Sequence, residues 1–284
     1  MKPFRYERAD SLRHACERLR SAEGYVKVLA GGQSLMPLMN LGLLELEGVI
    51  DIGRVDEGRG VHAEDGFLTI GALSHHAELV RDATLRARQP LIPAAARWIG
   101  SSRIRSVGTL GGSLVHSDPA AELPLVMVAL GAEYTLTTGV ASRTVRADEF
   151  HVSYFTSDIA EDELIESVRV PTLGSGWGWG FSEVSRRRGD FALAAVAALV
   201  RVAGGQVVEA RVALGGVHER PLRIGAVEAA VTGATRADLI ERIGPIDGIE
   251  PVSDTSASAE HRARLARVLT LRALGDALDR GEAT

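Results

Sequence analysis

Two short glycine motifs are the parts of this sequence whose residue types and spacing best suit ligand chemistry. Residues 30–34 read AGGQS and residues 109–113 read TLGGS, so each combines two adjacent glycines with a hydroxyl side chain. Glycine lets a ligand approach the main chain closely, and successive N–H groups in such a loop form a concavity for an anion. A helix that begins just after the loop adds its positive end. One motif suits one phosphate group, and two motifs brought together suit a pyrophosphate.

Neither motif matches a familiar nucleotide-binding signature. The sequence contains no G-x-G-x-x-G and no G-x-x-x-x-G-K-[ST], so neither the Rossmann nor the P-loop mode of binding is indicated. Each glycine pair taken alone is more typical of a tight turn, as at Gly204-Gly205. The spacing alone therefore leaves both interpretations open.

The other polar clusters give weaker signals. His75 and His76 are adjacent and would face different directions on a helix, so we expect a capping or solvated role rather than a metal site. His116 and Asp118, in the second motif's loop, either bind a ligand or satisfy the loop backbone. The run SRRRGD at 185–190 suits an anion clamp or a solvated turn equally. Neither G-x-S-x-G nor H-E-x-x-H occurs, so we name no catalytic residue and no metal ligand.

The elements expected around the motifs give an α+β fold. A strand precedes the first motif, and a glycine-broken loop carries the second and leads into a buried helix at 123–132. Glycines around two tryptophans at 172–181 indicate a linker or an edge strand, so we place a boundary there between domains 1–174 and 175–284. In the second domain we expect two long strands joined at Gly204-Gly205, with helices behind them.

The composition excludes several classes of protein. The 284 residues are 45% hydrophobic and 24% charged, which is typical of a globular chain of two domains. The net charge of −5 argues against a nucleic-acid partner. No apolar run approaches the ~20 residues of a membrane span and no signal peptide is visible, so we expect a cytoplasmic protein. The single cysteine, Cys16, can form neither an internal disulfide nor an iron–sulfur cluster, and we expect a small buried side chain.

The sequence as a whole resembles the FAD-binding medium subunit of molybdenum hydroxylases, the family of the carbon monoxide and xanthine dehydrogenases. The resemblance runs from FRYERADSLRHA to the C-terminal helix, and its main carriers are AGGQSLMPLMN, IGALSHHAEL, IRSVGTLGGSLVHSDPAAELP, DELIESVRVP and SRRRGDFALAAVA. It implies a PCMH-type FAD-binding domain, similar to vanillyl-alcohol oxidase and MurB, with two α/β subdomains. A smaller domain of antiparallel sheet and helices would follow, of the carbon monoxide dehydrogenase flavoprotein C-terminal type.

The resemblance also implies which residues bind FAD. The two motifs would hold the pyrophosphate, Lys27 would lie near the adenine, and Ile99 would pack beside the isoalloxazine. Glu122 would bond the ribityl chain or the flavin edge, and Phe191 would stack on the ring where relatives often carry tyrosine, without that hydroxyl. Taken by themselves, Lys27 also fits a solvated strand position, Ile99 a core position and Glu122 a helix start. The implied set is Lys27, Ala30, Gly31, Gly32, Gln33, Ser34, Ile99, Thr109, Gly111, Gly112, Ser113, Glu122, Ile165 and Phe191.

The function that the resemblance implies is electron transfer through non-covalent FAD. A molybdopterin centre on a large partner subunit would oxidise the substrate, 2Fe-2S clusters on a small subunit would carry the electrons, and the flavin would pass them to an external acceptor. The expected assembly is a dimer of heterotrimers. A stand-alone MurB-like FAD oxidoreductase with its own substrate pocket is the alternative, and the intact glycines disfavour a chain that has lost its flavin. The sequence identifies neither the substrate nor the acceptor among NAD, oxygen and quinone.

Overall fold

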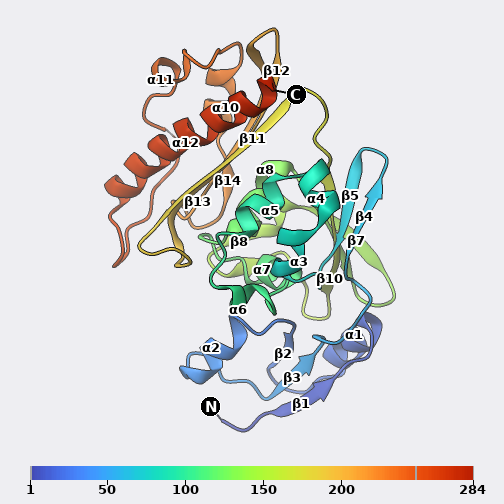
Figure 1. Ribbon diagram of the computed structural model, residues 1–284. Helices are drawn as coiled ribbons and strands as arrows, with labels where there is room; N and C mark the ends of the chain where they lie inside the picture. Colours follow the sequence, from blue (N-terminus) through green and yellow to red (C-terminus); the bar gives the residue numbers. More distant parts are fainter. Residues whose placement is uncertain (1, 247, 284) are drawn as a thin grey trace.

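The computed structural model describes residues 2–246 and 248–283, and in it three bodies follow one another along the chain (Figure 1). The N-terminal body has a parallel sheet in the order β1-β3-β2. Its elements are β1 (Arg5–Arg8), α1 (Leu12–Arg20), β2 (Val26–Leu29), α2 (Leu35–Asn40) and β3 (Gly48–Asp51). The Ser11 side chain caps α1, and the helix buries Cys16 in the small core of this body, as expected.

The central body carries an antiparallel sheet in the order β4-β5-β10-β6-β7, with helices on one side. Asp65-Gly66, a residue pair that favours a hairpin turn, joins its first two strands. Its strands are β4 (Val61–Glu64), β5 (Phe67–Gly71), β6 (Glu133–Thr137), β7 (Ser142–Arg146) and β10 (Leu164–Pro171), and a small hairpin of β8 (His151–Ser153) and β9 (Thr156–Ser157) lies beside them. Its helices are α3 (His76–Arg81), α4 (Ala83–Arg88), α5 (Leu91–Ala96), α6 (Ser102–Arg105), α7 (Leu110–His116), α8 (Glu122–Leu130) and α9 (Ala147–Phe150).

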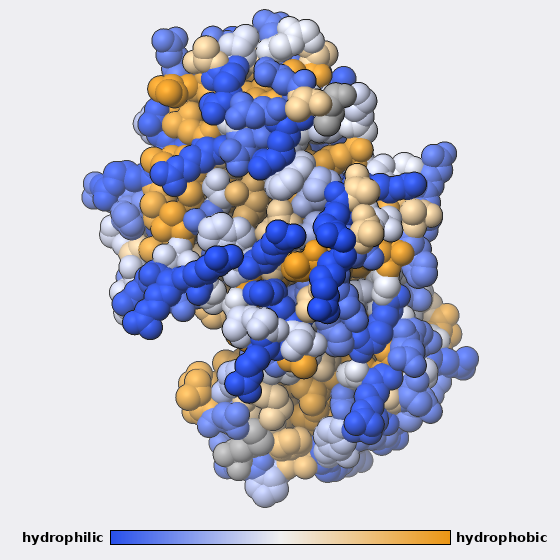
Figure 2. Space-filling view, in the orientation of Figure 1, coloured by the Kyte–Doolittle hydropathy of each residue, from blue (hydrophilic) through white to orange (hydrophobic). Residues whose placement is uncertain are grey.

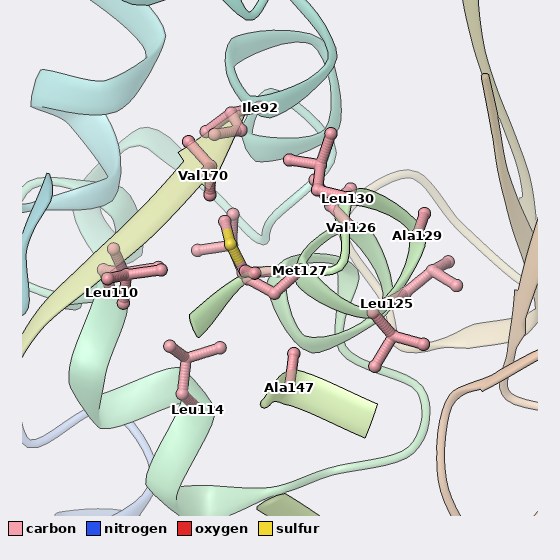
Figure 3. Packing of buried hydrophobic residues seen from close by; sticks show 14 of the residues in the cluster. Ile92, Leu110, Leu114, Leu125, Val126, Met127, Ala129, Leu130, Ala147 and Val170 are labelled. Atoms are coloured by element: carbon pink, nitrogen blue, oxygen red, sulfur yellow. The ribbon is translucent and has the colours of Figure 1, made fainter. Parts of the chain in front are cut away.

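Helix α8 is the centre of the core. Every residue of this helix is buried, because α5, α7 and the C-terminal sheet surround it, and a helix that is apolar on all sides is stable only in such a place. Figure 3 shows Met127 of α8 pointing between Leu110 and Leu114 of α7 and Val170 of β10. These contacts fix α7, the helix that carries the second glycine motif.

The C-terminal body has an antiparallel sheet in the order β11-β12-β13-β14 with one long helix on its outer face (Figure 1). Its elements are β11 (Trp177–Ser185), β12 (Ala192–Ala203), β13 (Gln206–Gly215), β14 (Leu222–Arg223), α10 (Gly225–Val231), α11 (Leu239–Arg242) and α12 (Ala259–Glu282). Alternate residues of β12 separate into two cores: Ala195 and Ala197 face the central body, whereas Val196 and Val200 face α12. The sheet therefore lies between the two.

The glycine-rich stretch forms an edge strand, one of the two forms expected for it. Gly178 and Gly180 of β11 face α12, where an added Cβ would lie 2.9 Å from the carbonyl carbon of Ala277 and 2.7 Å from that of Ala273. These glycines let the helix backbone come close to the strand. The neighbouring aromatic residues, Trp177, Trp179 and Phe181, face the central body instead.

One local expectation was wrong. The second glycine motif was expected to be a loop, but Gly111 and Gly112 lie in the first turn of α7. The Thr109 hydroxyl accepts the N–H of Gly112 at 3.2 Å and caps the helix, and this cap together with the buried Leu110 and Leu114 outweighs the poor helix propensity of two glycines.

Candidate FAD-binding site

The first glycine motif offers free backbone donors. It joins β2 to α2, and Gly32 has a φ of +68°, a conformation that favours glycine. Within residues 2–246 and 248–283, the N–H groups of Gly31, Gly32, Gln33 and Ser34 have no protein acceptor, and the Ser34 hydroxyl caps nothing. Such a row of unused donors is what an anion such as a pyrophosphate requires.

The second motif offers side chains rather than backbone donors. The N–H of Gly111 donates to Ala72 O at 2.7 Å, and the N–H of Ser113 donates to Thr109 O at 3.1 Å. Gly111 is buried against the end of β5, where an added Cβ would lie 2.8 Å from Ala72 Cβ, whereas Gly112 is exposed. The expected symmetry of the two motifs is therefore incomplete. The second presents the exposed backbone of Gly112 and the half-buried hydroxyl of Ser113, whereas Thr109 is buried and its hydroxyl caps α7.

The first motif touches the segment just before the second, although Gly31 and Gly111 are 80 residues apart in sequence. A Cβ on Gly31 would lie 2.7 Å from Gly108 Cα and 2.8 Å from the carbonyl carbon of Val107. His76, at the start of α3, fixes this segment: its backbone N–H donates to Gly108 O and its Nε2 donates to Thr109 O, both at 2.9 Å. The first motif thus rests directly on the segment that leads into the second.

The surface is hollowed beside this contact. Figure 2 shows a notch in the outline on the left, between the N-terminal body and the bodies above it, and Figure 1 places α2 below the notch and α6 above it. The glycine motifs lie next to these helices in the chain. A ligand gripped by both motifs would therefore lie between the N-terminal and central bodies.

The neighbourhood of Ile99 and Glu122 forms the second part of the site. Arg105 of α6 donates to the carbonyl oxygens of Ile99 at 2.7 Å and Gly100 at 2.8 Å. Glu122 is the first residue of α8 and is only 9% exposed. Its pKa is raised to about 7, mainly by burial and in part by the nearby Asp118, while a backbone hydrogen bond and Arg105 act in the opposite direction. A carboxyl group here can exchange a proton near neutral pH.

The remaining implied residues lie in three different settings. Lys27 is exposed on β2, with its ammonium 5.2 Å from the ring centre of Tyr25. Ile165 of β10 is buried at a bulge whose next residue accepts the N–H of Ala72, so it lies beside the Gly111 contact. Phe191 is 69% exposed, and the turn before it contacts the Ile99 region, since a Cβ on Gly189 would lie 3.1 Å from Gly100 O.

The weaker candidates have structural roles. His75 caps α3 in a capping box with Glu78, which agrees with one of the roles expected for it. His116 stacks on Phe155 at 5.0 Å between ring centres, and Asp118 accepts the N–H of Ala120 at 2.8 Å. The run 185–190 is the turn between β11 and β12. Among the described residues, no three His, Cys, Asp or Glu side chains are arranged to hold a metal ion.

The sequence analysis missed two residues of this region. Arg105 was not singled out, and only the fold shows that it holds the backbone of Ile99. Glu183 was not singled out either; it is 8% exposed, and burial, followed by the charge of Glu122, raises the pKa of Glu183. No pattern in the sequence pointed to either contact.

The two-motif site on this α+β fold defines the class of FAD-binding flavoproteins, and comparison with known proteins gives the family. Residues 2–173 match the FAD-binding domain of molybdopterin dehydrogenases. Residues 179–277 match the C-terminal domain of the CO dehydrogenase flavoprotein. The chain belongs to this family of FAD-binding flavoprotein chains of molybdopterin dehydrogenases, as the resemblance predicted. The expected fold class and cofactor are confirmed with it.

Curated relatives and solved structures agree over almost the full chain. The 6-hydroxypseudooxynicotine dehydrogenase complex subunit alpha of Paenarthrobacter nicotinovorans is 37% identical, covering 100% of this chain and 98% of its own. The glyceraldehyde dehydrogenase medium chain of Sulfolobus acidocaldarius is 35% identical, covering 95% and 96%. Among structures, the carbon monoxide dehydrogenase of Hydrogenophaga pseudoflava aligns with a TM-score of 0.92 at 33% identity, covering 99% of both chains. Quinoline 2-oxidoreductase of Pseudomonas putida aligns with a TM-score of 0.90 at 31%, covering 100% and 99%.

The residues present fit a bound FAD. The free N–H groups of the first motif and the hydroxyls of Ser34 and Ser113 supply donors without a competing protein partner in the described ranges, and Gly112 leaves exposed backbone beside them. In the part of the chain that the structure describes, no helix is long and apolar enough to cross a membrane.

Proposed function

We propose that this chain is the electron-transfer flavoprotein of a molybdenum-containing dehydrogenase complex. The observation that carries the proposal is the contact between the first glycine motif and the segment just before the second, which brings the free backbone donors of the first motif close to the second. Bound FAD would supply the redox chemistry, taking electrons from a partner and passing them to an external acceptor. The chain itself binds and orients the cofactor, and no residue is assigned a catalytic role.

In the proposed site, different sets of residues bind the different parts of FAD. The motifs at 30–34 and 109–113 would hold the pyrophosphate from two sides, with Lys27 towards the adenine. Ile99, Glu122, Ile165 and Phe191 would surround the flavin end. The positions support this division, because the turn before Phe191 lies against Gly100 and Ile165 lies beside the Gly111 contact. We propose the domain division at 174/175, close to where the two family matches end and begin.

The proposed partners are a large molybdopterin-binding subunit and a small 2Fe-2S subunit, arranged as a dimer of heterotrimers in the cytoplasm. The relatives support this, because their names describe medium chains or subunits of complexes. The single buried Cys16 cannot hold an iron–sulfur cluster, so the 2Fe-2S clusters would lie on another chain. The same relatives speak against a stand-alone MurB-like oxidoreductase.

The test of FAD binding is substitution of Gly112 by valine in the purified full chain. Gly112 is exposed, and an added Cβ would meet only the Thr109 hydroxyl at 2.8 Å, so we expect normal folding and loss of FAD. Measurements are flavin released on denaturation and circular dichroism. Gly225→Val is the control, because nothing lies within 4 Å of a Cβ there. Full flavin in the Gly112 variant would contradict the assignment.

The test of the partners is affinity purification of the tagged chain from its native cells. We expect an iron–sulfur polypeptide and a molybdenum polypeptide to elute with it. Turnover of a substrate by this chain alone would contradict the proposal and favour the stand-alone enzyme.

A further inference from the structure

A polar hollow lies between α3 and α6, and the proposed binding of FAD does not use it. Its volume is about 330 Å³. Residues of the two helices and of the C-cap of α6 line it, namely Ala77, Val80, Arg81, Ser102, Arg105 and Ser106. None of them belongs to the set proposed to bind FAD. The lining of this α3–α6 hollow has two arginines and no acidic side chain, so it suits an anion.

The two arginines carry donors that the chain leaves unused. Arg81 is exposed at the end of α3, and its guanidinium has no hydrogen-bond or ion-pair partner among the described residues. Arg105 is half-buried, and its Nη1 donates to Ile99 O and Gly100 O. Its Nε and Nη2 have no acceptor within residues 2–246 and 248–283. Like charges that line one hollow repel each other, and a bound anion removes that cost.

The nearest acidic residues along α3 are engaged elsewhere. Glu78 accepts the backbone N–H of His75 at 2.7 Å, and Asp82, which follows the helix, accepts the N–H of Leu85 at 2.8 Å. Both carboxylates line a different hollow, together with Arg59. Helix α6 contains no acidic residue. The charge of the two arginines is therefore not balanced by an acid of the helices that form the α3–α6 hollow.

The walls of the hollow are held in place by the fold itself. Helices α3 and α6 pack against each other. His76 ties the start of α3 to the backbone after α6, since it donates to Gly108 O and Thr109 O. The two carbonyl groups that accept from Arg105 fix its guanidinium in the same way. Binding an anion at such an arginine costs less side-chain entropy than binding one at a freely rotating side chain.

We propose that the α3–α6 hollow binds the phosphoryl group of a small phosphomonoester. Arg81 and Arg105 would hold the phosphoryl oxygens, because the planar fork of a guanidinium matches them in geometry and charge. Ser102 would donate a further hydrogen bond, since its hydroxyl has no partner in the part of the chain that the structure describes. The hydroxyl of Ser106 donates to Arg103 O at 2.8 Å instead.

The apolar side of the hollow favours a phosphomonoester over free phosphate. Ala77 and Val80 are half-buried on α3 and line the hollow beside the arginines. They would cover the carbon part of the ligand, which free phosphate lacks. The volume of about 330 Å³ also exceeds what one phosphate ion needs, and it falls at the lower end of the roughly 300–1,000 Å³ of small-molecule sites.

Isothermal titration calorimetry of the FAD-loaded full chain tests the site, with phenyl phosphate and inorganic phosphate as probes. We expect phenyl phosphate to bind once per chain and more tightly than inorganic phosphate. The same site should persist in the flavin-free chain, whose empty glycine motifs can bind phosphate as well. No binding of phenyl phosphate, or binding only to the flavin-free chain, would overturn the proposal. Inorganic phosphate that binds as tightly as phenyl phosphate would overturn the assignment to a phosphomonoester.

Three arginine variants show where the probe binds. Arg81→Gln should keep its fold, because Arg81 is exposed and has no partner in the described ranges. We expect its affinity for phenyl phosphate to fall at least about tenfold, the usual effect of losing a charged hydrogen bond. Arg105→Gln should weaken binding at least as much. Arg103→Gln is the matched control, because Arg103 is exposed on the same helix and does not line the hollow.

The outcome for Arg81 and Arg103 decides the proposal. Unchanged affinity in Arg81→Gln, or an equal loss in Arg103→Gln, would overturn it, since the second result would show a general effect of charge. Circular dichroism checks that each variant is folded. The proposal does not rest on the proposed function: were FAD not to bind, the proposed function would be contradicted, and the variants of the flavin-free chain would still decide this site.

Discussion

The carbonyl group of Val107 lies directly against Gly31, so that no side chain fits at position 31. This contact joins the N-terminal body to the segment before α7, and it makes one site of two glycine motifs. Its geometry separates the reason for each glycine. Gly31 is required by packing on Val107 and Gly108, and Gly111 by packing on Ala72. At Gly112 an added Cβ would meet only the Thr109 hydroxyl, at 2.8 Å.

Replacement of Gly31 by alanine should separate the two motifs. The added Cβ would lie 2.7 Å from Gly108 Cα, so the first motif must move, and we expect FAD affinity to fall by at least about tenfold, or about 1.4 kcal/mol. Fluorescence titration of the flavin-free chain measures the loss. Gly225→Ala, with open space around its Cβ, should bind FAD like wild type, and equal affinity in both variants would contradict the contact.

Thr109 should act through its hydroxyl. Thr109→Ala removes the cap that accepts the Gly112 N–H, so we expect α7 to lose about 1 kcal/mol of stability and FAD affinity to fall with it. Thr109→Ser keeps the hydroxyl and should restore both. Chemical unfolding and FAD titration of the two variants check this; a serine variant as weak as the alanine variant would show that the methyl group, not the hydroxyl, matters.

Gly178 and Gly180 should be essential for docking of α12. A Cβ at Gly180 would lie 2.7 Å from the carbonyl carbon of Ala273, so we expect Gly180→Ala to lower the free energy of unfolding by about 3 kcal/mol. Gly204→Ala is the control, because Gly204 has a positive φ of 59° but open space around its Cβ. It measures the loss of stability from backbone strain without a steric clash. Urea unfolding measures both, and a loss at position 180 no larger than at 204 would contradict close helix packing.

Acid should destabilise the chain partly through His151. The two ring nitrogens of this buried histidine contact the hydroxyls of Ser117 at 2.9 Å and Tyr134 at 3.2 Å. Burial lowers its pKa from 6.5 to about 4, with a further lowering by Arg220. The unfolded chain therefore binds the proton first, and stability is full above pH 6.5 and is lost as the pH falls towards 4. The full effect is about 3 kcal/mol.

The variant His151→Gln isolates this contribution. It is less stable than wild type at pH 7 because it lacks the paired ring, but the difference should shrink as the pH falls from 6.5 to 4. Urea unfolding at several pH values gives the difference directly, and the other titrating groups cancel in it. A difference that does not vary with pH would show that His151 keeps its ordinary pKa.

The sequence by itself determined the local features of the protein and its family. Gly204-Gly205 predicted the turn that joins β12 to β13, and the two motifs with their flanking residues predicted the family and its cofactor. Asp65-Gly66 is a turn pair of the same local kind, between β4 and β5. These features are local, since they depend on periodicity, turn chemistry and short motifs. For the same reason Cys16 could be predicted to be buried within α1.

Only the tertiary structure decided how these parts meet. The packing of α7 on Met127 accompanies a helix where a loop was expected. The N–H groups of the first motif are free, whereas those of Gly111 and Ser113 in the second donate to Ala72 and Thr109. The fold also buries Glu183 on the face of β11 that is turned towards the central body. Such contacts depend on how whole elements pack, and burial then sets the protonation of the groups that they enclose.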